Sequence, residues 1–374
     1  MTGLDDDLDA LGASIGEVLA TECGSRRMHA FIDGKVELAG GLWGLAASLG
    51  WLGLGLPEHH GGLGLGAAGW ATLHRCLGTR VAPGPFIATL CAAQALAAGS
   101  DPFVAQSLAG VVEGRTTFCI PALVAPVPDG RLSLRSGKLS GTSDILLGSA
   151  TASWALLPAL LPEGKRVWAI LDPRVERSRA KPCKGWDLTR ELCSLAVDGA
   201  PVESLIEEPE SVRRMDEALQ IHVALAVVFD SLGAASSILD QTIDYMKERI
   251  QFGKPIATLQ ALKHRAANLK VELELSRLLA SQAVVQVQTS SDSAWMWVCL
   301  AKEQCTQTFA KVAADCVQLH GGVGHTWEFD PHLFLKRARL NQAIGVSNPQ
   351  ALDIAAAAFA QAASAEVSLM DLPV

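Results

Sequence analysis

Several features that would assign this chain to a common functional class are absent from its 374 residues. Lys and Arg never form a run of five or more, and the formal net charge is −8, so charge-driven binding of nucleic acid is not expected. Aromatic residues make up only 5% of the chain, which favours helices over an all-β fold. The nine cysteines include no CxxC pair, so we expect free, buried thiols and neither a zinc ribbon nor a redox motif.

Signatures of export and of membrane insertion are absent as well. The first twelve residues are acidic, whereas a secretory signal begins with basic and then apolar residues. No stretch of 18 uncharged apolar residues lacks helix breakers, and the apolar segment Leu219–Val228 contains His222 and is followed by Asp230. We therefore expect a cytoplasmic protein without a membrane span, in which this segment is a buried core helix.

The composition and hydrophobic pattern of the sequence change at two points along the chain. Residues 1–114 carry Ala and Leu at helical spacing between Gly and Pro residues. Residues 115–208 contain short apolar segments bounded by Gly, Pro, Asp and Ser, which predicts strands and turns. Residues 209–374 return to long helices, the longest over about 216–249 and another over 261–286. The sequence predicts a mainly α protein with an N-terminal helical domain, a middle β domain and a C-terminal helical bundle.

The segment Glu248–His264, ERIQFGKPIATLQALKH, ends a predicted helix at a Gly-x-Pro corner. Arg249 lies near that helix end. A cation in this position can simply offset the helix dipole. The planar guanidinium can also hold a phosphate through two hydrogen bonds. The residues alone leave both interpretations open.

The segment Gln318–Ala338, QLHGGVGHTWEFDPHLFLKRA, contains closely spaced glycines that predict a loop which a ligand or another backbone can approach. These glycines do not form a GxGxxG fingerprint. Three histidines accompany them: His320, His325 and His332. Their spacings of five and seven fall on a Gly-rich turn, so ordinary packed or exposed histidines are favoured over a metal site.

Taken together, the two segments resemble the acyl-CoA dehydrogenase family. The first matching motif is Arg249-Ile-Gln-Phe-Gly-Lys-Pro-Ile with Leu259-Gln260 and Lys263-His264. The second is Gln318-Leu-His-Gly-Gly-Val-Gly-His-Thr-Trp-Glu with Lys336-Arg337-Ala338. The GHTWEFDPHLFLKRA wording is similar to the branch that includes bacterial steroid side-chain dehydrogenases. Looser matches, such as Gly55-Leu-Pro-Glu-His-His-Gly-Gly-Leu-Gly, Lys138-Leu-Ser-Gly and Asp187-Leu-Thr-Arg, extend the resemblance over nearly the whole chain.

The resemblance implies the same three-part fold and an FAD bound at a subunit interface. In this family one subunit's Arg-x-x-Phe and Gln-x-x-Gly-Gly segments hold the ADP part of the partner's FAD. The matching cofactor-binding residues are Arg249, Phe252, Gln260, Gln318, Gly321 and Gly322. It also implies α,β-dehydrogenation of an acyl-CoA thioester, with an electron-transfer flavoprotein or a similar acceptor for the complex.

The carboxylate base of that reaction is missing at both family positions. Counting along the motifs places these positions at Gly345, or an immediate neighbour, and at about Val223. Neither residue accepts a proton. On the same helix Glu217 lies almost two turns before Val223, and Asp230 lies two turns after it. We expect no catalytic residue in this chain, since a shift of one or two residues would bring neither carboxylate to the base position.

The subunit's own flavin face also departs from the family. Where the family has a Thr-Glu-Pro and Gly-Ser-Asp-like stretch, this chain has Cys119-Ile-Pro-Ala-Leu-Val-Ala-Pro-Val-Pro, which is apolar. Asp144-Ile-Leu-Leu-Gly stands near the place of the aromatic-Ile-Thr word that usually backs the flavin. The chain therefore keeps the residues that would contact a partner's cofactor, and it lacks those that would contact a cofactor of its own.

This asymmetry predicts a non-catalytic subunit that completes the FAD site of a catalytic sister subunit in an α2β2 assembly. The branch resemblance suggests a bulky acyl-CoA substrate such as a steroid side-chain thioester. Two alternatives stay open. The chain could be a self-sufficient acyl-CoA dehydrogenase with an unrecognised base, or a flavin-free degenerate homologue with a binding role.

Overall fold

The computed structural model describes residues 2–99, 102–123, 131–327 and 329–364. The first part is helical, with α1 (Thr2–Glu22), α2 (Ser25–Ile32), α3 (Ala39–Ser48), the short η1 (Trp51–Gly53) and η2 (Glu58–His60), α4 (Gly66–Thr79), α5 (Phe86–Ala97) and α6 (Pro102–Val112). The strands follow: β1 (Phe118–Pro121), β2 (Leu132–Arg135), β3 (Lys138–Thr142), β4 (Leu146–Leu147), β5 (Trp154–Leu160), β6 (Arg166–Leu171), β7 (Ser178–Cys183), β8 (Leu192–Pro201) and β9 (Ser204–Ile206).

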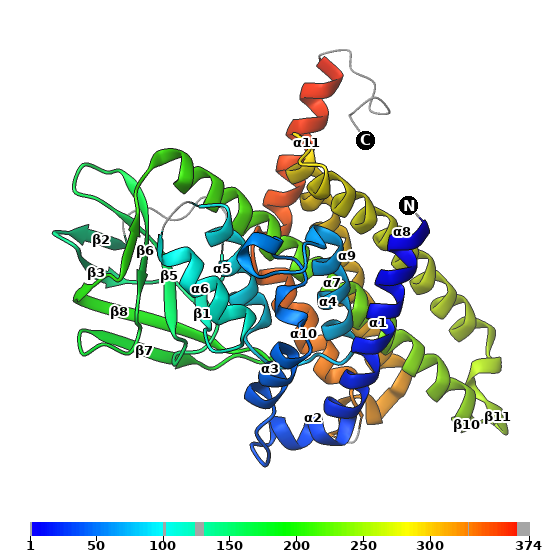
Figure 1. The fold of residues 1–374 in the computed structure, drawn as a ribbon. Coiled ribbons are helices and arrows are strands. Elements are labelled where there is room, and N and C mark those ends of the chain that lie inside the picture. The colour runs from blue at the N-terminus through cyan, green and yellow to red at the C-terminus, as the bar shows by residue number, and fades with distance from the viewer. Residues whose placement is uncertain (1, 100–101, 124–130, 328, 365–374) are drawn as a thin grey trace.

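The last part is again helical and holds the longest helix. Its elements are α7 (Pro209–Glu248), the hairpin β10 (Ile250–Gln251) and β11 (Lys254–Pro255), η3 (Ile256–Thr258), α8 (Gln260–Gln288), α9 (Ala294–His320), η4 (Gly321–His325), α10 (Pro331–Ala343) and α11 (Asn348–Ser364). Figure 1 shows the sheet at one side of the molecule and the helices of both helical parts packed together at the other. The predicted fold class is confirmed. The division at residues 114 and 208 falls between α6 and β1 and between β9 and α7, and as a set of domains it remains a prediction.

The sheet closes on itself as a small barrel. Its strand order is β1-β4-β8-β3-β2-β5-β6-β9, with β7 beside β8, and β1 also pairs with β5. Most pairs are antiparallel, but β1 and β2 both run parallel to β5. Alternate residues face the interior, as in β2, where Leu132 and Leu134 are buried while Ser133 and Arg135 are exposed. The barrel thereby has an apolar core of its own.

Helix α7 is the central element of the helical body. It begins at Pro209, and the side chain of Glu208 caps it by accepting hydrogen bonds from the backbone N–H groups of Glu210 and Ser211. Residues 223–228 of α7 are 0% exposed, because α4, α5 and α9 pack around it. Among the described helices, α7 alone is long and apolar enough to cross a bilayer, yet 78% of the apolar window is buried within the protein. This is the burial expected of a core helix.

Two glycines let α4 and α7 cross in backbone contact. A Cβ atom on Gly78 of α4 would lie 2.1 Å from the carbonyl oxygen of Asp230, and one on Gly233 of α7 would lie 1.9 Å from the carbonyl oxygen of Arg75. No side chain fits at either position while the helices stay at this distance. The crossing places Asp230 at the junction of α4, α7 and α10.

A buried network of charged side chains forms at this junction, which we call the charge network: Asp187, Thr189, Arg190, Asp230, Arg337 and Asn341. Arg337 Nε donates to Asp187 Oδ2 over 2.7 Å and its Nη1 donates to Asp230 Oδ1 over 2.9 Å. Its Nη2 donates to the backbone oxygens of Val81 and Ala82. The network thereby joins the α4–α5 loop, the β7–β8 loop, α7 and α10.

The charges of the network balance, since two aspartates face two arginines. Arg190 lies 2.9 Å from Asp230 and also donates to Asn341 Oδ1, while Asn341 Nδ2 donates to Asp230 Oδ2 over 2.8 Å. Burial raises the pKa of the Asp230 carboxyl, but the two arginines and Asn341 outweigh burial and hold that pKa below its ordinary value. The ionised Asp230 carboxylate stabilises the fold fully above the ordinary carboxyl pKa of 3.8. This stabilisation is lost as the pH falls through the lowered pKa of Asp230.

We predict that Asp230→Asn lowers the free energy of unfolding by about 3–5 kcal/mol, because it leaves two buried arginines with one carboxylate. The matched control is Asp244→Asn on the same helix, whose ion pair with Lys247 is exposed on both sides. We expect that control to change the free energy by less than about 1 kcal/mol. Urea unfolding followed by circular dichroism measures both, and equal effects of the two substitutions would contradict the assignment.

Candidate functional site

The six predicted cofactor-binding residues lie at the end of the bundle that carries the β10–β11 hairpin. Arg249 is the C-cap of α7, and Phe252 is at the turn of the hairpin with φ of 51°. Gln260 is the first residue of α8. Gln318 lies in the last turn of α9, and Gly321 and Gly322 follow that helix in η4. Segments about seventy residues apart in the sequence therefore share one edge, which we call the cofactor edge.

A small apolar cluster holds the two motifs together beneath this edge. Met246 and Ile256 from the first motif pack with Leu319 from the second. The ring of Tyr245 stacks on His320, with 4.3 Å between the ring centroids. Because these contacts link the end of α7, η3 and the end of α9, the orientation of the edge residues is set by the packed bundle.

The side chains of the cofactor edge face outward. Arg249, Gln260 and Gln318 are exposed, and the Phe252 ring is 88% exposed. None of the described residues forms an ion pair or a side-chain hydrogen bond with Arg249. A Cβ atom added to Gly321 or Gly322 would meet nothing within 4 Å, and Gly321 has φ of 65°. Such an edge offers a free guanidinium, an aromatic ring and accessible backbone, which are groups that suit a pyrophosphate and a planar ring.

The two family positions of the base converge in space. Val223 of α7 and Gly345, in the loop after α10, are 122 residues apart in the sequence. A Cβ atom on Gly345 would lie 3.3 Å from Cγ1 of Val223, and the φ of Gly345 is 76°. The two base positions predicted from the motifs therefore lie side by side in the structure. The residues that meet there are an apolar valine and a glycine.

The cleft beside this position is closed by a direct contact between the bundle and the barrel. The backbone N–H of Gly345 donates to the carbonyl oxygen of Ala122 over 2.8 Å, and Ala122 N–H donates in turn to Ile145. Cys119, Ile120 and Pro121 of β1 are buried. In the stretch predicted to have lost its flavin contacts, residues 119–122 are thus buried within the protein, whereas Leu123 is 50% exposed. The rest of the stretch, up to Pro128, lies outside the described residues. This arrangement does not fit a flavin ring held by this chain.

The cavities near the closed cleft are small. One of about 20 Å³ borders His74, Phe86, Asp230 and Arg337 and is large enough for a single water molecule. His74 Nε2 has no hydrogen-bond partner among the described residues, and burial lowers its pKa to about 3, so this ring is neutral. An acyl chain does not fit there.

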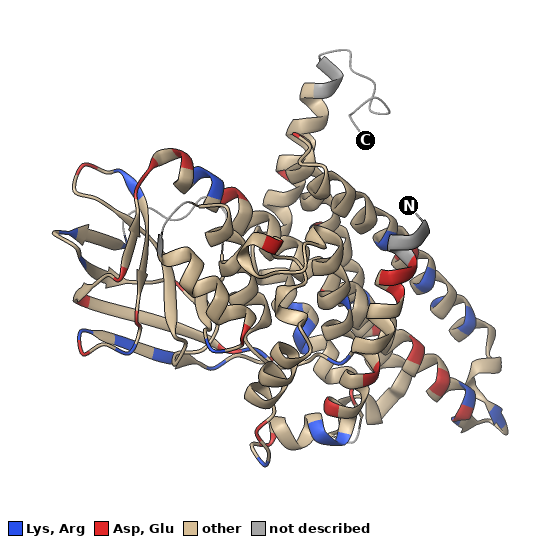
Figure 2. Ribbon diagram, in the orientation of Figure 1, with Lys and Arg blue, Asp and Glu red and all other residues tan. Residues whose placement is uncertain are grey.

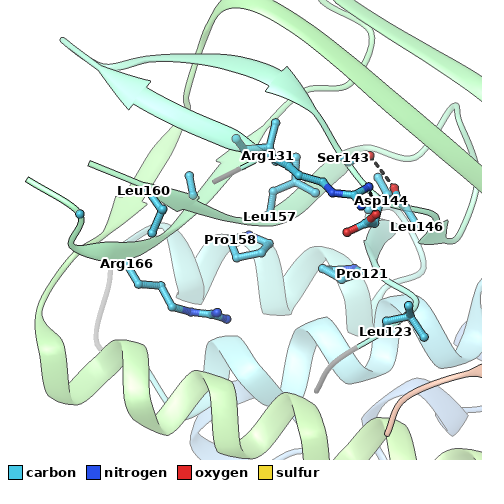
Figure 3. A pocket seen from close by; sticks show the side chains of 13 residues that line it. Pro121, Leu123, Arg131, Ser143, Asp144, Leu146, Leu157, Pro158, Leu160 and Arg166 are labelled. Carbon is cyan, nitrogen blue, oxygen red and sulfur yellow. Dashed lines mark hydrogen bonds and ion pairs between the residues drawn. The ribbon is translucent and has the colours of Figure 1, made fainter. Parts of the chain in front are cut away.

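A larger cavity of about 150 Å³ opens at the side of the barrel (Figure 3). Leu146, Leu157 and Leu160 line it, with Arg166 at one end and the Arg131–Asp144 ion pair at the other. Its volume is below the range of about 300–1,000 Å³ that is usual for small-molecule sites.

The carboxylates weighed as substitute bases have other roles. Asp230 belongs to the charge network, and Glu217 is exposed and bonded to Arg213. No described group of three or more His, Cys, Asp or Glu residues could hold a metal ion, and of the three motif histidines His320 and His332 are buried while His325 is exposed. In the described part of the chain all nine cysteines are free, and all but Cys183 are buried, as predicted.

Sequence reasoning missed the charge network and the contact of Gly345 with Ala122. One signal for the network was available, because Asp230 interrupts an apolar helix and Arg337 follows an apolar stretch. Charged residues in such positions are seldom buried without a partner. Nothing in the sequence indicates that Asp187 is that partner, since it lies 43 residues before Asp230 and 150 before Arg337.

Known proteins match the chain over most of its length. Sequence models of the acyl-CoA dehydrogenase N-terminal and C-terminal domains match residues 5–115 and 213–359. Acyl-CoA dehydrogenase IpdE2 of Mycobacterium tuberculosis is 28% identical over 334 residues, which are 89% of this chain and 91% of the relative.

Two solved structures show that the fold is shared. A steroid ACAD variant of Tcur3481–Tcur3483 has a TM-score of 0.84 at 24% identity and covers 96% of this chain and 99% of that chain. The ChsE4–ChsE5 complex from Mycobacterium tuberculosis has a TM-score of 0.83 at 21% identity, with 95% and 97% covered. The two matched domains, the full-length relative and the common fold together establish that this chain belongs to the acyl-CoA dehydrogenase family.

Proposed function

We propose that this chain is the non-catalytic subunit of a hetero-oligomeric, FAD-dependent acyl-CoA dehydrogenase of the cytoplasm. It completes the FAD site of a catalytic sister subunit through the cofactor edge. When bound, FAD supplies hydride acceptance in the α,β-dehydrogenation of an acyl-CoA thioester, and an electron-transfer flavoprotein or a similar protein would reoxidise the complex. This chain's residues bind and orient the ADP half of the cofactor.

The observation that carries the proposal is the meeting of Val223 and Gly345. An acyl-CoA dehydrogenase needs a carboxylate beside the α carbon of its substrate, positioned and tuned in pKa by burial. Neither residue at the converging position can remove a proton. The Gly345–Ala122 hydrogen bond also joins bundle and barrel beside this position. The proton transfer is therefore assigned to another chain.

The cofactor edge supports the second half of the proposal. Arg249 and the aromatic ring of Phe252 are both exposed, and two open glycines lie on the same edge. We would not expect a chain that no longer contacts flavin to keep this set of groups together. The guanidinium can form two hydrogen bonds with a pyrophosphate, and the glycines let a ligand reach the backbone. Because these groups point away from their own chain, the cofactor they fit belongs to the sister subunit.

The relatives favour a divided assembly and a bulky substrate. One of the similar structures is the ChsE4–ChsE5 complex, and another is a steroid ACAD that carries two names, Tcur3481 and Tcur3483. By analogy we propose an α2β2 assembly that acts on a bulky acyl-CoA such as a steroid side-chain thioester. This substrate class rests on the analogy alone.

The first test is purification of the chain alone and with its sister, which we expect to be encoded by an adjacent dehydrogenase-like gene. Alone, the chain should bind no FAD and oxidise no acyl-CoA. The co-expressed complex should contain one FAD for each pair of chains, measured by flavin absorbance against protein mass. A yellow, active single chain would refute the proposal, and a complex without flavin would show that the edge has no cofactor role.

The second prediction concerns the pyrophosphate contact. Arg249→Ala should weaken FAD binding by the complex about tenfold to a hundredfold, since a hydrogen bond to a charged group contributes about 1.5–3 kcal/mol. FAD retention during gel filtration and titration of the apo-complex measure the change. The matched control is Arg135→Ala on the exposed face of β2, which should bind FAD normally. Equal binding by both variants would remove Arg249 from the site.

The third prediction concerns the closed cleft. Gly345→Glu restores the family carboxylate, but we expect the chain alone to stay inactive towards acyl-CoA. The new side chain would be strained at φ of 76° and would press on Val223. The second variant, Val223→Glu, tests the other base position without the strained backbone. Acyl-CoA oxidation by either variant without the sister chain would show that the cleft opens and accepts a flavin.

A further inference from the structure

Trp186, in the loop between β7 and β8, is one of the most exposed apolar residues of the protein. It is 83% exposed, and Leu188, two residues on, is 52% exposed. Among the described large apolar residues only Phe252 of the cofactor edge, at 88%, is more exposed. A single exposed leucine is ordinary, but a tryptophan is usually buried over most of its surface. Neither the cofactor edge nor the closed cleft includes these two side chains, so the proposed function does not account for their exposure.

The loop that carries these two residues is held in place from beneath. Asp187 lies between them and is 5% exposed, because its carboxylate accepts a hydrogen bond from Arg337 in the charge network. Asp187 Oδ1 also accepts from the backbone N–H of Thr189 over 2.9 Å, and Thr189 is buried as well. Since residues 187 and 189 face inward, Trp186 and Leu188 face outward. The loop therefore presents two apolar side chains to solvent in a fixed backbone conformation.

A basic strand leads into this loop. Arg179 and Lys181 share the outer face of β7, and Lys184 directly follows the strand. All three side chains are exposed, and no described residue forms an ion pair with them. Figure 2 shows Lys and Arg along β7, the lowest strand of the sheet in this view. Between residues 177 and 188 the only carboxylate is that of Asp187, which is buried, so the strand and the loop form a locally positive surface.

The basic residues of β7 also have an ordinary structural explanation. The strand lies at the edge of the sheet and, among the described strands, pairs with β8 alone. Basic residues and proline on an edge strand hinder pairing with strands of other molecules, and β7 carries Pro182 as well. This explanation does not extend to an exposed tryptophan beside the strand, since such a residue promotes association. The cations and the tryptophan together therefore suit a partner that is both anionic and apolar.

An acidic protein and an anionic lipid surface both offer this combination. A stable protein interface buries about 800 Å² on each partner. An aromatic side chain buries about 150–250 Å², so Trp186 and Leu188 supply too little apolar area for the core of such an interface. A lipid surface needs less, because a tryptophan ring enters the headgroup region while neighbouring lysines and arginines stay at the level of the phosphates. The small apolar area and the unpaired cations favour the lipid surface.

We propose that these five residues, which we call the β7 surface, dock the protein on a membrane surface that contains anionic lipid. Trp186 and Leu188 enter the headgroup region, and Arg179, Lys181 and Lys184 contact lipid phosphates. The net charge of −8 does not prevent this contact, because at about 0.1 M salt the Debye length is about 10 Å and remote acidic residues are screened. The contact is peripheral and reversible, and it uses no membrane-spanning segment.

Vesicle flotation tests this proposal, and it does so independently of the proposed function because the β7 surface belongs wholly to this chain. The co-expressed complex, or the full chain if no complex forms, should float at about 0.1 M salt with vesicles of phosphatidylcholine and phosphatidylglycerol, but not with phosphatidylcholine alone. At about 1 M salt, where the Debye length is about 3 Å, binding should weaken at least about tenfold. Failure to bind the anionic vesicles would overturn the proposal in favour of an acidic protein partner. Equal binding to both compositions would also overturn it.

A charge variant locates the contact on β7. Lys181→Glu should weaken binding to the anionic vesicles at least about fivefold, since one basic residue near such a surface contributes about that factor. The matched control is Lys138→Glu on β3, which changes an exposed lysine of the same sheet and should bind as the wild type does. Lys138 pairs with Pro201 at the far end of β8, whereas the loop that carries Trp186 joins the near end. Equal binding by the two variants would contradict the assignment.

Tryptophan fluorescence tests whether Trp186 enters the lipid. Vesicles with brominated acyl chains quench tryptophans that insert, so wild-type fluorescence should fall on binding. Trp186→Phe should still bind, because a phenyl ring also enters the headgroup region, but it should lose most of the quenching. The control is Trp327→Phe, which removes another exposed tryptophan, 54% exposed, and should keep the quenching. Quenching that persists in Trp186→Phe and disappears in Trp327→Phe would place the contact elsewhere and overturn the proposal.

Discussion

The arrangement of this protein depends on the charge network around Asp230 and Arg337. Arg337 is 1% exposed and binds Asp187 from the β domain, Asp230 from α7 and two backbone oxygens from the α4–α5 loop. Buried charges of this kind are tolerated only when every one has a partner, so the parts of the chain that supply partners are held in one relative position. The barrel and the bundle meet across this junction, and the loop that carries Gly345 follows directly from α10.

This fixed junction explains how a flavoenzyme fold can lack a usable cleft. The barrel and bundle are held close enough for the Gly345 N–H to reach the Ala122 carbonyl, and the cavity left at the network admits one water molecule. In the opposite direction along α7, the same helix ends at Arg249 and presents that residue to solvent. Helix α7 thus links the buried contact between bundle and barrel with the exposed cofactor edge. This arrangement matches the division of roles that we propose for the two chains of the assembly.

The outer face of α8 keeps apolar side chains at the protein surface. A helix in a bundle buries one stripe, and the opposite stripe is usually polar. On α8 the opposite stripe keeps Val271, Leu275 and Leu278 exposed.

The order of elements, the helix end at Arg249 and the lack of a carboxylate at Gly345 were predictable from sequence because each depends on a local residue pattern. Periodicity shows helices and strands, the motif around Arg249 shows a helix end, and the absence of a carboxylate at Gly345 is a matter of counting. Only the tertiary structure decided that Val223 and Gly345 share one position, that Asp187 neutralises Arg337, and that Ala122 closes the cleft. These facts depend on contacts between residues far apart in the chain, and local residue patterns carry no information about such distances.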